Sequence, residues 1–193
     1  MRFDLSIVKN PEAFFCDLVN TAAKNQKAVI SEHAKIYLVN LLCQNALGNN
    51  LINRADTPIS IILQRSLMEP LKQRRATLKY VGDYSLYVAG YFSESLNRKI
   101  IDVGCYISLG GQAFGNLSNI ANSSETSNLY LEMFNKFSSL VDILTEISFE
   151  TSITKAEDLI RMYDRWLHTG STILEKKLME KGIITSDKKL KTA

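Results

Sequence analysis

Cysteine and histidine are scarce in this chain, and the few that occur are scattered. Cys16, Cys43 and Cys105 fit no CxxC spacing, so we expect neither a disulfide framework nor a zinc site, and free thiols suit a reducing compartment such as the cytoplasm. His33 and His168 stand outside any HExxH motif. Because histidine and cysteine are common ligands of transition metals, we predict no metal site and no cofactor.

The sequence motifs of several enzyme classes are also missing. There is no GxSxG and no GK[ST], and GGQAFG at 110–115 follows a helical pattern rather than a strand, which argues against a nucleophile elbow, a P-loop and a dinucleotide-binding turn. We therefore predict no catalytic residue and favour a non-catalytic protein over an enzyme, without deciding between the two. A thiol and a histidine that meet only in the folded chain stay an open alternative.

Long apolar runs are absent as well. Residues 1–12, MRFDLSIVKNPE, hold no apolar stretch long enough for a signal peptide. Residues 103–124 carry no formal charge, but their glycine, asparagine and serine content would make transfer into hydrocarbon unfavourable. We expect no membrane insertion.

The charge gives little reason to expect nucleic acid as a partner. The formal net charge is +3, and the lysines of residues 184–193 can supply all of it; we expect that segment to be a flexible basic tail. A second basic cluster lies further upstream, at Lys72, Arg74, Arg75 and Lys79. Its footprint is small for a nucleic-acid interface.

Helical periodicity dominates the chain, and hairpin signals such as Asn-Gly are absent. Asn10 and Ser31 are placed to cap helices, NSSE at 122–125 begins a helix that continues to Leu144, and a capping box at 154–157 begins another. Pro70 should kink or break the helix that contains it. We predict an all-α, single-domain bundle of six to eight helices over residues 1–183.

Residues 76–95 predict an unusual helix. Its tyrosines fall within about 60° of arc at 100° per residue, at Tyr80, Tyr84, Tyr87 and Tyr91. Asp83 is the lone charge among residues 80–92. If it is buried it needs a partner, and we expect Lys79, one turn earlier, or an arginine from a neighbouring helix.

The next predicted helix, residues 101–121, carries a stripe of small residues, Gly104, Ser108, Gly111 and Gly115. Glycines inside a helix lower its stability relative to alanine, so we expect close approach of a neighbouring helix or of a flat ligand at this stripe. Our hypothesis is that the tyrosine stripe packs over this glycine stripe, large side chains against small ones.

Two sets of candidate site residues follow from these patterns. A small-molecule pocket between the helices 76–95 and 101–121 would use Asp83, Tyr84, Tyr87, Gly111 and Gly115, with Arg65 or Arg75 pairing an anion. A protein-partner surface would use Arg161, Arg165 and Trp166, since tryptophan and arginine are enriched at interfaces. A tryptophan in this position more often anchors a terminal helix to its own core.

The segments LKQRRATLKYVGDYSLYVAGYFSESLNRKIIDVGCYISLGGQAFGNL and LIRMYDRWLHTGS resemble a family of bacterial proteins with no established activity. The matching elements, within residues 60–183, are Gly82-Asp83, Ser85-Leu86, Gly90-Tyr91-Phe92, Asp102-Val103, Tyr106-Ile107 and Tyr163 through Ser171. The resemblance implies a cytoplasmic, all-helical bacterial protein.

A fainter likeness points to the haem-oxygenase-like bundles. The Gly-Asp-x-Ser text at 82–85 and the Gly-Gly-Gln text at 110–112 look like elements of those bundles, in which glycines let a flat macrocycle approach. Here the two elements fall on two separate predicted helices, and no histidine is placed beside them.

Two functions are consistent with these observations. We expect first a non-catalytic helical module that binds or regulates a macromolecular partner, most plainly a protein. The alternative is a binder of, or enzyme for, a flat or apolar small molecule, with or without a negative charge.

Overall fold

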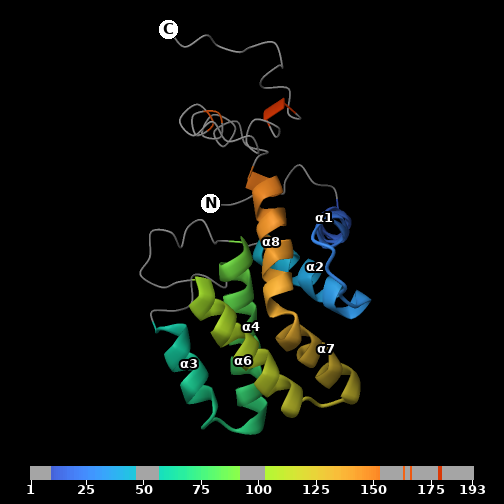
Figure 1. The fold of residues 1–193 in the computed structure, drawn as a ribbon. Helices are drawn as coiled ribbons and strands as arrows, with labels where there is room; N and C mark the ends of the chain where they lie inside the picture. Colours follow the sequence, from blue (N-terminus) through green and yellow to red (C-terminus); the bar gives the residue numbers. More distant parts are fainter. Residues whose placement is uncertain are drawn as a thin grey trace. The chain divides into compact units, whose positions relative to one another are not determined.

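The computed structural model describes residues 10–46, 57–91 and 103–152, together with Tyr163, Trp166, Leu178 and Met179. Within these residues every regular element is a helix and there is no strand (Figure 1). The seven helices are α1 (Pro11–Asn25), α2 (Glu32–Ala46), α3 (Ile59–Ser66), α4 (Leu71–Tyr91), α6 (Val103–Asn119), α7 (Ser124–Asn135) and α8 (Phe137–Ser152). The predicted all-α fold of six to eight helices is confirmed.

The chain divides into two compact units, Met1–Ser148 and Phe149–Ala193. The seven helices belong to the first unit, except for the last turn of α8. In the second unit Leu178 is fully buried. The single domain expected over residues 1–183 stays a prediction, and the expected tail at 184–193 and capping box at 154–157 lie outside the described residues.

Helix boundaries follow the capping chemistry of the sequence. The Asn10 side chain accepts a hydrogen bond from the backbone N–H of Ala13 at 3.2 Å, and the Ser31 hydroxyl accepts one from Ala34 at 3.1 Å, as N-cap residues do. Around Pro70 the chain ends α3 and begins α4. The proline therefore separates two helices rather than kinking one.

The prediction of a single helix from residue 122 through Leu144 is wrong. The structure has α7 and α8, which meet at Lys136, where the backbone turns to φ −111° and ψ 18°. The Lys136 ammonium donates to the backbone carbonyl of Val29 at 2.5 Å and to Glu132 at 3.0 Å. The break thus sits where α7 is tied to the turn between α1 and α2, a long-range contact that local periodicity does not encode.

One hydrophobic cluster joins all seven helices of the first unit. Its largest fully buried side chains include Phe15 of α1, Leu38 of α2, Phe114 of α6 and Ile143 of α8. Helix α4 packs most extensively on α6, and α6 packs next on α7, as the neighbouring ribbons in Figure 1 show. No helix in the described part of the chain is long and apolar enough to cross a membrane.

Close helix packing occurs at three glycines that leave no room for a methyl group. A Cβ at Gly82 would lie 2.7 Å from the Phe114 ring, and one at Gly110 would lie 2.2 Å from Phe137 and 2.8 Å from Ser85 Cβ. At Gly90 the obstacle is Leu144 Cβ, at 2.5 Å. These glycines bring α4 close to α6 and α8.

The tyrosines do not pack over the glycine stripe, and that hypothesis is corrected. Gly104 and Ser108 are exposed. A Cβ at Gly111 or at Gly115 would have Phe134 of α7 as its nearest neighbour, at 3.8 and 3.3 Å. The tyrosine rings pack on one another instead, with centroids 5.9 Å apart for Tyr80–Tyr84 and 5.3 Å apart for Tyr87–Tyr91. Tyr87 is buried and the other three are half-buried.

Substitution of Gly90 by alanine should lower the free energy of unfolding by about 1–3 kcal/mol, because overpacking forces neighbouring groups to move. The new methyl would meet Leu144 Cβ and, at 3.1 Å, the Val141 carbonyl oxygen. Gly111→Ala is the matched control. Its methyl makes only an ordinary contact at 3.8 Å, so it should be neutral or stabilise the helix by up to about 1 kcal/mol. Urea denaturation of both variants measures this, and equal losses would contradict the packing described.

Candidate functional site

Asp83 of α4 is a buried carboxylate at the centre of a polar cluster. Its side chain is only 8% exposed. The Lys79 ammonium, one turn earlier on the same helix, lies 2.5 Å from Oδ2, and the Tyr37 hydroxyl of α2 donates to Oδ1 at 2.5 Å. The expected partner Lys79 is confirmed. Tyr37 was not expected and links α4 to α2.

Aromatic rings surround this cluster. The Lys79 ammonium lies 5.0 Å from the centroid of the Tyr37 ring, within reach of a cation–π attraction. Tyr37 meets Phe114 edge to face with centroids 6.0 Å apart, and Phe114 stacks on Tyr130 at 5.9 Å. Asp83 is therefore enclosed by α2, α4, α6 and α7.

Burial dominates the protonation behaviour of the pair. Desolvation raises the pKa of Asp83 above its ordinary value, although the Lys79 charge and the hydrogen bonds from Lys79 and Tyr37 oppose the shift. Burial, together with the neighbouring Asp83 carboxylate, also raises the pKa of the Tyr37 phenol well above its usual range. The phenol thus keeps its proton and acts as a hydrogen-bond donor to Asp83.

A cavity of about 160 Å³ lies beside the cluster, between α2 and α4. Its lining residues are Tyr37, Asn40, Leu41, Gln44, Lys79 and Asp83. The three polar residues of α2 recur at spacings of three and four, at 37, 40 and 44, which puts them on one helical face. That spacing was the available signal, and the sequence interpretation missed it.

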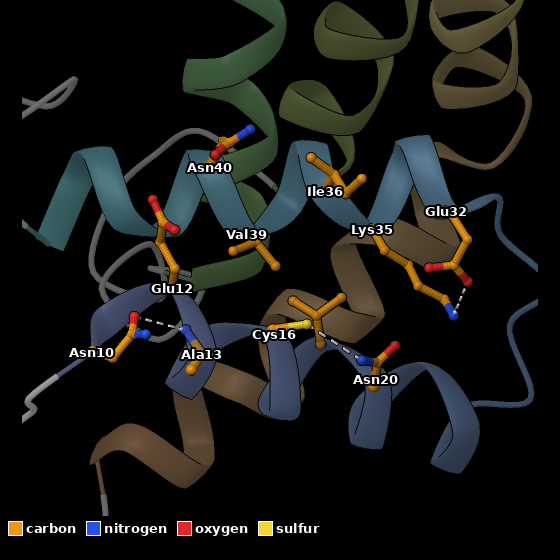
Figure 2. Close-up of a pocket in the computed structure, with 11 residues that line it drawn as sticks. Asn10, Glu12, Ala13, Cys16, Asn20, Glu32, Lys35, Ile36, Val39 and Asn40 are labelled. Atoms are coloured by element: carbon orange, nitrogen blue, oxygen red, sulfur yellow. Dashed lines mark hydrogen bonds and ion pairs between the residues drawn. The ribbon is translucent and has the colours of Figure 1, made fainter.

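A larger groove, of about 370 Å³, lies between α1 and α2 (Figure 2). Side chains from both helices line it: Asn10, Glu12, Ala13, Cys16, Val19, Asn20, Glu32, Lys35, Ile36, Val39 and Asn40. Figure 2 shows Glu12 extending from α1 toward α2. The amide of Asn20 donates to the Cys16 sulfur at 3.5 Å, and Lys35 pairs with Glu32 at 2.7 Å. None of the groove residues was predicted as a site.

The predicted small-molecule residues are not gathered into one site. Asp83 bonds to Tyr37 of α2, whereas Tyr84 packs near Tyr106, with centroids 6.2 Å apart, and Tyr87 stacks on Tyr91. Gly111 and Gly115 lie against Phe134. Where Gly82 meets Phe114, and where Gly110 meets Ser85, side chains fill the space between α4 and α6, so a ligand cannot lie between the helices at these positions.

The remaining predicted residues lie apart from both hollows. Arg75 donates from Nε to the carbonyl of Ile120 at 2.5 Å, just beyond the end of α6, where a cation is favourable. Arg65 is exposed on α3. Trp166 is half-buried with its ring centroid 5.6 Å from that of Tyr163; Arg161 and Arg165 lie outside the described residues.

Metal chemistry finds no support in the part of the chain that the structure describes. Those residues contain no group of three histidine, cysteine, aspartate or glutamate side chains that could hold an ion. His33 lies 4.0 Å from Glu125, with both side chains exposed.

Comparison of the chain with protein-family models, with curated proteins and with solved structures gives no match. The likeness to a bacterial family therefore stays a prediction.

The hydrogen bond from Tyr37 should stabilise the fold measurably. Tyr37→Phe leaves Asp83 Oδ1 without its donor, and we expect a loss of about 1–3 kcal/mol in the free energy of unfolding. Tyr130→Phe is the matched control, because Tyr130 belongs to the same aromatic cluster. Its hydroxyl has no hydrogen-bonding partner among the described residues. This substitution should change stability by less than about 0.5 kcal/mol. Chemical denaturation distinguishes them, and equal effects would show that the Tyr37 bond contributes nothing.

The raised pKa of Asp83 makes stability depend on pH in a defined direction. A carboxyl with a raised folded pKa contributes most below its unfolded value of 3.8, and this contribution is lost as the pH rises through the folded pKa. Wild type should therefore gain stability relative to Asp83→Asn as the pH falls from 7 toward 4. Urea unfolding of both proteins across this range measures the difference. A difference that grows with rising pH would mean that Lys79 lowers the pKa of Asp83 instead.

Proposed function

We propose that this chain is a non-catalytic helical module that holds a short segment of a partner protein in the groove between α1 and α2. The observation that carries the proposal is the groove itself, about 370 Å³ and open along two helices. Grooves between helices commonly receive a partner's amphipathic helix.

The apolar part of the groove suits an apolar anchor from the partner. Ile36 is 56% exposed, and Val19 and Val39 lie beside it in the lining. Covering an exposed isoleucine and seating an aliphatic side chain against it would each contribute free energy in proportion to the apolar area removed from water. The partner segment therefore presents a leucine, isoleucine or phenylalanine at its centre.

The charge of the groove suits a basic residue next to that anchor. Glu32 and Lys35 neutralise each other at 2.7 Å, whereas Glu12 has no hydrogen bond or ion pair among the described residues. Its carboxylate is near enough to α2 that, after burial, it is the second cause of the raised pKa of Cys43. One unpaired negative charge on the groove selects a lysine or arginine on the partner.

The compartment we propose is the bacterial cytoplasm. The three cysteines are free thiols, with Cys16 and Cys105 exposed and Cys43 buried, which suits a reducing environment. The bacterial origin rests on the family resemblance alone. A protein partner is favoured over nucleic acid because the groove carries a net negative charge.

Selection from a displayed library of random peptides tests the proposal, with calorimetry to measure the affinity of the enriched peptides. Enriched peptides should place lysine or arginine beside a large apolar residue. Ile36→Glu should weaken their binding by more than about tenfold, which corresponds to about 1.4 kcal/mol. Ile61→Glu, a change at an exposed isoleucine of α3, is the matched control and should bind normally.

Reversing the charge of Glu12 provides a second test. Glu12→Lys should weaken the basic peptides several-fold and favour acidic ones, because the groove would then carry net positive charge. Enrichment without a basic residue, or peptides that bind Ile36→Glu as well as wild type, would overturn the proposal.

A further inference from the structure

We propose that the 160 Å³ cavity between α2 and α4 is a second, separate binding site, and that it takes a small monocarboxylate. The cavity combines one ammonium, two amides and one aliphatic side chain around the Asp83–Tyr37 hydrogen bond. Only Asn40 also borders the α1–α2 groove. The inference therefore does not depend on the proposed partner segment.

The unused hydrogen-bonding capacity of this cavity consists mostly of donors. An ammonium has three N–H groups, and Lys79 uses one of them on Asp83 Oδ2. Its side chain is 44% exposed, so its remaining N–H groups can reach the open space. A ligand with acceptor oxygens satisfies them.

Two amides on α2 extend the donor set. Asn40 and Gln44 are one helical turn apart and both exposed, and neither side chain has a hydrogen-bonding partner among the described residues. Each can donate two N–H groups. An anion that bridges Lys79 and Gln44 would have donors from α4 on one side and from α2 on the other.

Cations are disfavoured although a carboxylate lines the cavity. Both Asp83 oxygens already accept hydrogen bonds at 2.5 Å, from Tyr37 and from Lys79. A cationic ligand would find the Asp83 charge already neutralised by Lys79 and would have to displace one of these donors. The carboxylate therefore positions Lys79 and is not the group that receives the ligand.

The size of the cavity limits the ligand to a few atoms. A volume of 160 Å³ holds about five water molecules at roughly 30 Å³ each, so an acid of three to five carbons is about the right size. Leu41 supplies the apolar contact for its short chain. Butyrate is a suitable probe.

The test is a titration of the ¹⁵N-labelled protein with butyrate, with the neutral amide butyramide and with the cation butylammonium. Saturable binding of butyrate, with shifts of the Asn40 and Gln44 side-chain amides, is expected. Butyramide should bind at least tenfold more weakly, and butylammonium should cause no saturable shift. Equal binding of butyrate and butyramide would overturn the proposal. So would the absence of a saturable shift at every butyrate concentration tested.

Variants locate the site. Lys79→Met should abolish butyrate binding, whereas Lys35→Met, which removes a lysine from the α1–α2 groove, should leave it unchanged. If Lys79→Met does not fold because Asp83 loses its charged partner, Gln44→Leu decides the question. Gln44 is exposed, so this variant should keep the wild-type melting temperature and bind butyrate several-fold more weakly; unchanged affinity would place the anion elsewhere.

Discussion

The close approach of α4 to α6 and α8 is the constraint on which the rest of this unit depends. At Gly82, Gly90 and Gly110 the neighbouring side chains occupy the space that a methyl group would need, so the helices meet at the surface of the backbone. Hydrogen bonds also hold the end of α4: the hydroxyls of Thr145 and Ser148 of α8 donate to the backbone carbonyls of Gly90 and Tyr91. Because α4 is enclosed on these sides, its polar side chains are carried into the interior, and Asp83 must find donors there.

The donors that Asp83 finds explain the position of α2. Lys79 comes from its own helix, but the second donor, Tyr37, comes from α2, and this bond places α2 over the face of α4 that carries the charge. The adjoining face of α2 is then free to meet α1. One helix thereby forms a wall of both hollows, with Asn40 bordering each of them.

Features that depend on a single helix could be predicted from the sequence, whereas contacts between two helices could not. The caps at Asn10 and Ser31 are set within a few residues, and the sequence predicts them correctly. The break at Pro70 and the pairing of Lys79 with Asp83 are also local, and each was one of two expected alternatives. The partner of the glycines was assigned wrongly because periodicity gives the faces of a helix but not its rotation against a neighbour. Tyr37 and the break at Lys136 depend on contacts between residues far apart in the chain, which no local spacing contains.

A buried ion pair is by itself weak support for stability, because the desolvation of two charges can equal or exceed their attraction, and apolar replacements are often neutral or stabilising. The cost falls mostly on Asp83, whose side chain is 8% exposed, because the Lys79 side chain is 44% exposed. An apolar pair of similar volume would avoid this cost. What such a pair could not do is keep an ammonium at the wall of a cavity, held by a carboxylate whose oxygens are already occupied. The polarity of this part of α4 therefore supports our proposal that the cavity takes an anionic ligand.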